Sequence, residues 1–200
     1  MNANIPALFR SYQSQETHSG CKIWEAARAT SAERSFFKHI EIGNKQPFID
    51  GGLGHNNPSK LVLKEAQVVF PTQEIGRLVS IGAGQAEVIS FKTFGFFQQI
   101  VPTDIIDTLK DISTDCEATH EDMLLFFANS PNTYFRINVE QGMQGIKLSE
   151  WEKIANVEAH TMQYLRRNEV AEKLTLMINA IKSPKMQPMI EQFGMKQFII

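Results

Sequence analysis

The 200-residue sequence contains little cysteine, carries almost no net charge and has no long apolar run. Cys21 and Cys116 are too few for a disulfide framework, so both are expected to be reduced thiols. A formal net charge of −2 gives no basic footprint for nucleic acid. No apolar stretch approaches the roughly 18 to 20 residues of a transmembrane helix, and the N-terminus lacks a signal-peptide pattern. We therefore expect a cytoplasmic protein with no transmembrane segment and no nucleic-acid partner.

The most informative motif places one carboxylate, Asp50, between an apolar pair and two glycines. Phe48 and Ile49 are typical of the end of a buried strand, and Gly51 and Gly52 are expected to reverse the backbone through positive φ. Asp50 would then lie at a strand tip, where parallel α/β sheets bind and react with ligands. A turn aspartate that closes its own loop is the alternative interpretation.

A helix is predicted directly after this turn. Asparagine is favoured as an N-cap and proline at the first helical position, so Asn57 and Pro58 indicate a helix start. Apolar residues then recur at helical spacing as far as Phe70, and Pro71 is expected to end the helix.

Three polar residues of the turn are candidates for orienting the Asp50 carboxylate. They are His55, Asn56 and Asn57, and the alternative is that they only shape the turn. Together these patterns predict a strand, a glycine turn and a helix around one carboxylate.

Two further motifs flank the aspartate. Residues 24–32 include the small-residue run Ala-Arg-Ala-Thr-Ser-Ala, and residues 78–84 form an apolar run that ends in Gly-Ala-Gly. With Asp-Gly-Gly and Asn-Asn-Pro between them, these segments resemble, in order, the motifs of the patatin-like phospholipases and acyl hydrolases. The resemblance covers roughly residues 8–84, and the later helices are similar to the tail of fungal members.

The resemblance implies an α/β fold, a partial three-layer α/β/α patatin-like sheet with a mainly helical C-terminal part. It implies that Asp50 is catalytic, that the substrate of the intact enzyme is a lipid acyl ester, and that no metal or organic cofactor takes part. Family members attack the ester with a serine on a Gly-x-Ser-x-Gly turn, beside a glycine-rich oxyanion loop.

Neither the Gly-x-Ser-x-Gly turn nor a Gly-Gly-Gly-x-x-Gly loop occurs in this sequence, so it contains no candidate nucleophilic serine. A general base without a nucleophile does no chemistry, and losing one oxyanion donor alone commonly costs on the order of 100- to 1000-fold in rate. The chain is therefore expected to be the C-terminal portion of such a hydrolase, inactive unless another chain supplies the missing N-terminal half. The alternative is a non-catalytic remnant that binds a partner or lipid, and both interpretations are compatible with peripheral membrane contact.

The domain organisation follows from the same match. Residues 1–84 are expected to be the C-terminal portion of the catalytic domain, 85–182 a mainly helical extension with one strand, and 183–200 a loosely ordered tail.

Within the extension, residues 103–129 predict helices broken near residues 113–115. Residues 133–139 alternate apolar and polar side chains, which predicts a strand with one buried side. A Ser-x-x-Glu capping box at Ser149 and Glu152 predicts a helix start, and residues 159–181 are expected to be helical.

Cys116 and His120 would share one face of a helix, where they could bind a metal or form a Cys–His nucleophilic pair. Zinc sites need three or four ligands, so ordinary helix residues are the preferred interpretation and no metal site is predicted.

Overall fold

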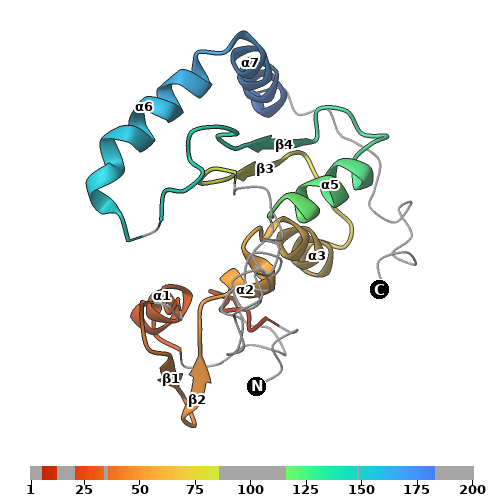
Figure 1. The fold of residues 1–200 in the computed structure, drawn as a ribbon. Helices are drawn as coiled ribbons and strands as arrows, with labels where there is room; N and C mark the ends of the chain where they lie inside the picture. The colour runs from red at the N-terminus through yellow and green to blue at the C-terminus, as the bar shows by residue number, and fades with distance from the viewer. Residues whose placement is uncertain (1–5, 13–20, 34–35, 86–115, 148, 183–200) are drawn as a thin grey trace, which may run out of the picture. The chain divides into compact units, whose positions relative to one another are not determined.

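The computed structural model describes five stretches of the chain, which are residues 6–12, 21–33, 36–85, 116–147 and 149–182 (Figure 1). They divide into two compact units, the first ending at Asn56 and the second containing the described residues from Asn57 onward. Helices and small sheets occur together, so the fold is of the α/β kind. The three-layer arrangement and the domain limits at residues 84 and 182 stay predictions, and the tail at 183–200 lies outside the described residues.

The first unit packs a helix and a β-hairpin around a small apolar core (Figure 1). Its elements are α1 (Ile23–Thr30), β1 (Ile40–Ile42), β2 (Gln46–Phe48) and the short helix α2 (Gly52–His55). The strands pair antiparallel, with Ile40 opposite Phe48. Ala29 of α1, Ile42 and Phe48 form the buried core, and the Phe9 ring packs against Phe48 with the centroids 5.3 Å apart.

The strand before Asp50 is therefore antiparallel, whereas a parallel sheet was expected. Three residues, 43–45, join β1 to β2, and parallel neighbours need a crossover of a dozen or more. Gly43 and Lys45 have φ of +61° and +59°, the left-handed conformation that lets the chain reverse in so few residues. Among the described residues, Asp50 thus follows a hairpin and not a parallel strand.

The second unit contains a parallel pair of strands with helices on both faces (Figure 1). Its elements are α3 (Ser59–Val69), β3 (Leu78–Ile81), α5 (Cys116–Phe126), β4 (Tyr134–Ile137), the 3-10 helix η1 (Trp151–Lys153), α6 (Ile154–Leu165) and α7 (Asn168–Lys182). Leu78 lies opposite Tyr134 in the parallel register. The apolar run that begins at residue 78 forms the strand β3, and the end of the preceding helix before Phe70 and Pro71 is confirmed.

Two apolar clusters cover β4. On one face Tyr134 packs with Leu63 of α3 and Met123 of α5, and on the other Ile137 packs with Val139 and Tyr164 of α6. The prediction of one buried side was therefore wrong, because a parallel strand covered by helices on both faces buries both sets of side chains.

Other predictions for the extension are confirmed only in part. A helix exists at α5, and residues 103–115 lie outside the described part of the chain. The capping box at Ser149 and Glu152 is absent, because η1 begins after Glu150, whose carboxylate accepts a hydrogen bond from the Lys147 N–H at 2.8 Å. The helix expected at 159–181 begins earlier and is divided, since Asn168, a residue favoured at helix starts, begins α7. No helix within the described stretches combines the length and the apolar character needed to cross a bilayer.

Gly82 immediately follows β3, where two polar side chains of β4 and its continuation approach the backbone. Its N–H donates to the Ile137 carbonyl at 2.8 Å. A Cβ atom at this position would lie 2.3 Å from Asn138 Oδ1 and 2.9 Å from Arg136 Nη2. Glycine is therefore required here for close approach, and not for an unusual φ.

Replacing Gly82 by alanine is expected to lower the free energy of unfolding by about 1 to 3 kcal/mol, because the methyl group displaces buried polar side chains. Urea denaturation measures the loss. The matched control is Gly76→Ala, where nothing lies within 4 Å of an added Cβ and the change is expected to stay within about 0.5 kcal/mol. Equal midpoints for the two variants would contradict the packing argument.

Candidate active site

Asp50 is held beside the C-terminal end of α1 by a backbone hydrogen bond. Its N–H donates to the Ala32 carbonyl, with an N···O distance of 3.1 Å. Ala32 is fully buried, at 0% exposure, and Asp50 is half-buried. A hydrogen bond shielded from water in this way is not readily exchanged for one to solvent. The bond therefore brings the small-residue segment and the Asp-Gly-Gly motif together in one place.

The two glycines after Asp50 do not act as predicted. Gly51 has a φ of −75°, and the positive φ in this turn belongs to Gly54, at +84°. The reason is that the chain enters the helical turn α2 at once, which requires negative φ at its first residues. Gly52 instead provides space, since a Cβ there would lie 3.1 Å from Asp50 Oδ2. The Asp50 carboxylate thus lies against the Gly52 backbone.

The turn residues after the glycines have separate surroundings. The His55 N–H donates to the Gly51 carbonyl at 3.1 Å, which closes α2, and His55 is half-buried while Asn56 is exposed. Asn57 is buried and belongs to the second unit. The orienting role of His55, Asn56 and Asn57 stays a prediction.

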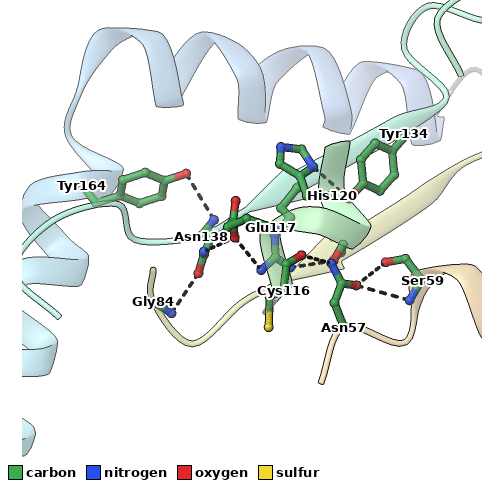
Figure 2. A network of polar contacts seen from close by, with 11 residues as sticks. Asn57, Ser59, Gly84, Cys116, Glu117, His120, Tyr134, Asn138 and Tyr164 are labelled. Atoms are coloured by element: carbon green, nitrogen blue, oxygen red, sulfur yellow. Dashed lines mark hydrogen bonds and ion pairs between the residues drawn. The ribbon is translucent and has the colours of Figure 1, made fainter. Parts of the chain in front are cut away.

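The helix after Asn57 begins one residue later than predicted, because Pro58 is the N-cap and Ser59 is the first helical residue of α3. Asn57 Oδ1 accepts hydrogen bonds from the Ser59 N–H at 3.2 Å and the Ser59 hydroxyl at 2.7 Å. Its Nδ2 donates to the Cys116 carbonyl at 3.0 Å, so the same side chain ties α3 to the first residue of α5 (Figure 2). The Asn57 amide thus connects the start of α3 to the start of α5.

The hydroxyls of the small-residue segment serve its own helix. Thr30 Oγ1 donates to the Ala27 carbonyl at 3.1 Å, and Ser31 Oγ donates to the same carbonyl at 2.8 Å. Both groups thereby satisfy the last turn of α1, which otherwise has unpaired carbonyls.

A polar network in the second unit centres on Arg136, a strand residue that is 5% exposed. Its Nη1 donates to the Ser80 hydroxyl on β3 at 2.9 Å, and its Nη2 pairs with the Glu117 carboxylate on α5 at 3.2 Å. A buried charge is costly unless it is paired and hydrogen-bonded, so Glu117 is required by Arg136.

Asn138 extends this network beyond the end of β4 (Figure 2). Its Nδ2 donates to Glu117 at 3.1 Å, while its Oδ1 accepts from the Gly84 N–H at 2.8 Å. The Asn138 N–H donates to the Tyr164 hydroxyl at 3.4 Å. The loop after β3, the start of α5 and the C-terminal end of α6 are thereby joined at the carboxyl ends of the two parallel strands.

Sequence reasoning missed this network. The one available signal was a charged residue, Arg136, inside a run of apolar strand residues, which indicates a buried ion pair once both faces are known to be covered. The identity of its partner Glu117 depends on how α5 packs, and that is not visible in local sequence.

Cys116 and His120 both lie on α5, as predicted, but the contacts do not indicate catalysis. His120 Nδ1 and the Tyr134 hydroxyl share a hydrogen bond of 3.1 Å (Figure 2). Burial lowers the pKa of His120, so its imidazole is neutral at pH 7, and burial raises the pKa of Tyr134. Among the residues that the structure describes, no three His, Cys, Asp or Glu side chains are grouped as metal ligands.

The chain is similar to several phospholipases. Calcium-independent phospholipase A2-gamma from Homo sapiens is 32% identical over 154 residues, which cover 75% of this chain and 19% of that protein. Phospholipase A I from Arabidopsis thaliana is 28% identical over 179 residues, or 82% of this chain and 13% of that protein. Patatin-like phospholipase 1 from Plasmodium falciparum (isolate NF54) is 27% identical over 134 residues, or 58% of this chain and 20% of that protein.

The chain thus spans about a fifth or less of the length of the curated relatives it matches. No protein-family profile matches the sequence, and no solved structure matches it.

Replacing Asn57 by alanine is expected to lower the free energy of unfolding by about 1 to 3 kcal/mol, because the Ser59 N–H and hydroxyl lose a buried acceptor and the Cys116 carbonyl loses a donor. Chemical denaturation monitored by circular dichroism measures the loss. Asn156→Ala, on the exposed surface of α6, serves as the control and is expected to change stability by less than about 0.5 kcal/mol. If both variants unfold at the same denaturant concentration as the parent, the connection that Asn57 makes between α3 and α5 does not stabilise the fold.

Proposed function

The chain belongs to the patatin-like phospholipase family, and on this basis we propose that it is the C-terminal portion of a lipid acyl hydrolase that carries the aspartate of a Ser–Asp dyad. The aspartate is Asp50. The observation that supports this assignment is the hydrogen bond from the Asp50 N–H to Ala32, which joins two of the three family motifs.

The proposed chemistry assigns Asp50 the role of general base. A serine hydroxyl is a weak nucleophile until a positioned group removes its proton during attack. Asp50 accepts that proton as the serine oxygen bonds to the acyl carbon, then returns it to the departing alcohol. Water hydrolyses the acyl-enzyme by the same route, with Asp50 taking the proton of the water and restoring it to the serine. No metal or organic cofactor is part of this scheme.

The position of Asp50 suits this role. Its backbone N–H is hydrogen-bonded to the buried Ala32 carbonyl, and its carboxylate lies against Gly52. Both the backbone and the side chain of Asp50 therefore have defined positions. General-base catalysis needs heavy-atom distances of about 2.6 to 3.2 Å to the reacting hydroxyl, which a mobile side chain satisfies only part of the time.

The serine and the oxyanion donors must then come from polypeptide outside these 200 residues, in keeping with the small share of the relatives that the chain covers. Exposed apolar side chains support an additional covering surface. Ile23 on α1 is 91% exposed and Ile81 on β3 is 80% exposed. Parallel strands are normally buried on both faces, so an exposed isoleucine on β3 favours further polypeptide packing there.

The same exposed side chains also favour the second candidate, a non-catalytic module that binds a partner or lipid. The two functions differ in whether Asp50 matters to ester hydrolysis. A first, simple observation is whether the coding sequence upstream contains Gly-x-Ser-x-Gly in the same reading frame, as the hydrolase proposal requires.

The decisive experiment joins the chain to the upstream part of a patatin-like phospholipase and measures hydrolysis of a phospholipid and of a soluble acyl ester. The isolated chain is expected to give the background rate. The joined enzyme is expected to turn over both esters, and Asp50→Asn is expected to lower kcat about 100- to 10,000-fold, because the general base is lost.

Asp122→Asn is the matched control, since this α5 carboxylate pairs with Lys60 on α3 within the second unit and takes no part in the proposed dyad. Its rate is expected to equal that of the parent. A joined enzyme that retains full activity with asparagine at position 50 would contradict the general-base assignment and leave the binding module as the better interpretation.

A further inference from the structure

We propose that Arg28 is a positioning residue for Asp50. Arg28 lies on α1 within the small-residue segment, and nothing in the dyad chemistry uses it directly. The inference rests on the proposed function in assigning Asp50 as the base, but its structural part is measurable without any catalysis.

Arg28 makes two contacts with the segment that leads into β1. Its Nη2 donates to the Lys38 carbonyl at 2.7 Å, and its guanidinium carbon lies 5.5 Å from the centroid of the Phe37 ring. A guanidinium group donates to a carbonyl and stacks on a ring at the same time, which a lysine ammonium does less well. Residues 37–38 are thereby held against α1.

These contacts complete a closed path of connected segments that includes Asp50. From α1 the chain passes through Lys38 to β1, then through the hairpin to β2, and reaches Asp50, whose N–H returns to Ala32 at the end of α1. Arg28 is the side chain that joins α1 to the segment leading into β1. If it is lost, one restraint on the position of the hairpin along α1 is removed, and a displacement of β1 reaches Asp50 because β1 and β2 are paired in fixed register.

One detail argues against a purely stabilising role for Arg28. Its Nη1 is buried and has no hydrogen-bond partner among the described residues, and such an unpaired donor costs free energy. An apolar residue at this position would avoid that cost. The arginine is better explained by the geometry it imposes on the Lys38 carbonyl.

Amide hydrogen exchange of the 200-residue chain, followed by NMR, tests the inference directly. Arg28→Ala is expected to speed exchange of the Asp50 amide by about 10- to 100-fold, the factor expected from losing a charge-assisted hydrogen bond. The amide of Ala26, which donates to the Lys22 carbonyl at the other end of α1, is the internal reference and is expected to change less than about threefold.

Arg167→Ala is the matched control. Arg167 also combines a hydrogen bond, to Glu140 at 3.0 Å, with a ring contact, 6.0 Å from the Tyr164 centroid, but it lies in the second unit. Its loss is expected to leave Asp50 exchange unchanged. Arg28→Lys keeps the donor to the Lys38 carbonyl and is expected to restore at least part of the protection, and it also provides a folded variant if the alanine variant does not fold.

Activity of the joined enzyme gives the second readout. Arg28→Ala is expected to lower kcat about 10- to 100-fold with KM changed less than about twofold, because Arg28 acts on the base and not on the substrate. Uniform acceleration of Asp50 and Ala26 exchange, or unchanged Asp50 exchange, would overturn the positioning role. A failure of the proposed function appears differently, as an Asp50→Asn variant that remains active whatever Arg28 does.

Discussion

The hydrogen bond between the Asp50 N–H and the Ala32 carbonyl is the constraint on which the first unit depends. It joins the end of α1 to the end of the β1–β2 hairpin, beside the small apolar core and the Arg28 contacts that also hold α1 and the hairpin together. The small residues at and just after the end of α1 make this possible, because Ala29 and Ala32 have no side chain large enough to keep the hairpin away. The small side chains of Ala29 and Ala32 therefore let the hairpin approach α1 closely, and this close approach gives Asp50 a defined location.

The second unit is organised by a different kind of interaction, a buried charge. Arg136 connects β4 to β3 through Ser80 and to α5 through Glu117. A charge in a covered strand is tolerated only with such partners, so it specifies how α5 must dock as well as contributing to cohesion. Gly82 completes the arrangement by leaving room for the arginine and for Asn138. The buried charge of Arg136 thus requires both the Glu117 carboxylate as its partner and the space left by Gly82 at one end of the parallel strands.

Much of the local structure was predictable because it rests on short-range rules. The presence of a helix after Asn57, to within one residue at its start, and its end before Pro71 follow from side-chain chemistry within a few positions. The conformations of Gly51 and Gly52 were wrong, since whether a glycine turns left-handed or enters a helix depends on the next residues. The expectation of a parallel strand before Asp50 was wrong, because apolar runs do not encode strand direction.

The site was predictable to a lesser degree. Asp50 was identified through its motif, whereas its link to Ala32 and the contacts of Arg28 with Lys38 and Phe37 depend on tertiary packing. The same is true of the pairing between Glu117 and Arg136, whose residues lie on elements brought together only in the folded unit.

The exposed Ile81 on β3 has a consequence for how such a chain behaves in concentrated solution. An apolar side chain that faces water favours association with another apolar surface, and the edge of β3 that has no neighbour among the described strands is a template for pairing with an extended segment of another molecule. Self-association would then compete with the packing of any further polypeptide against β3.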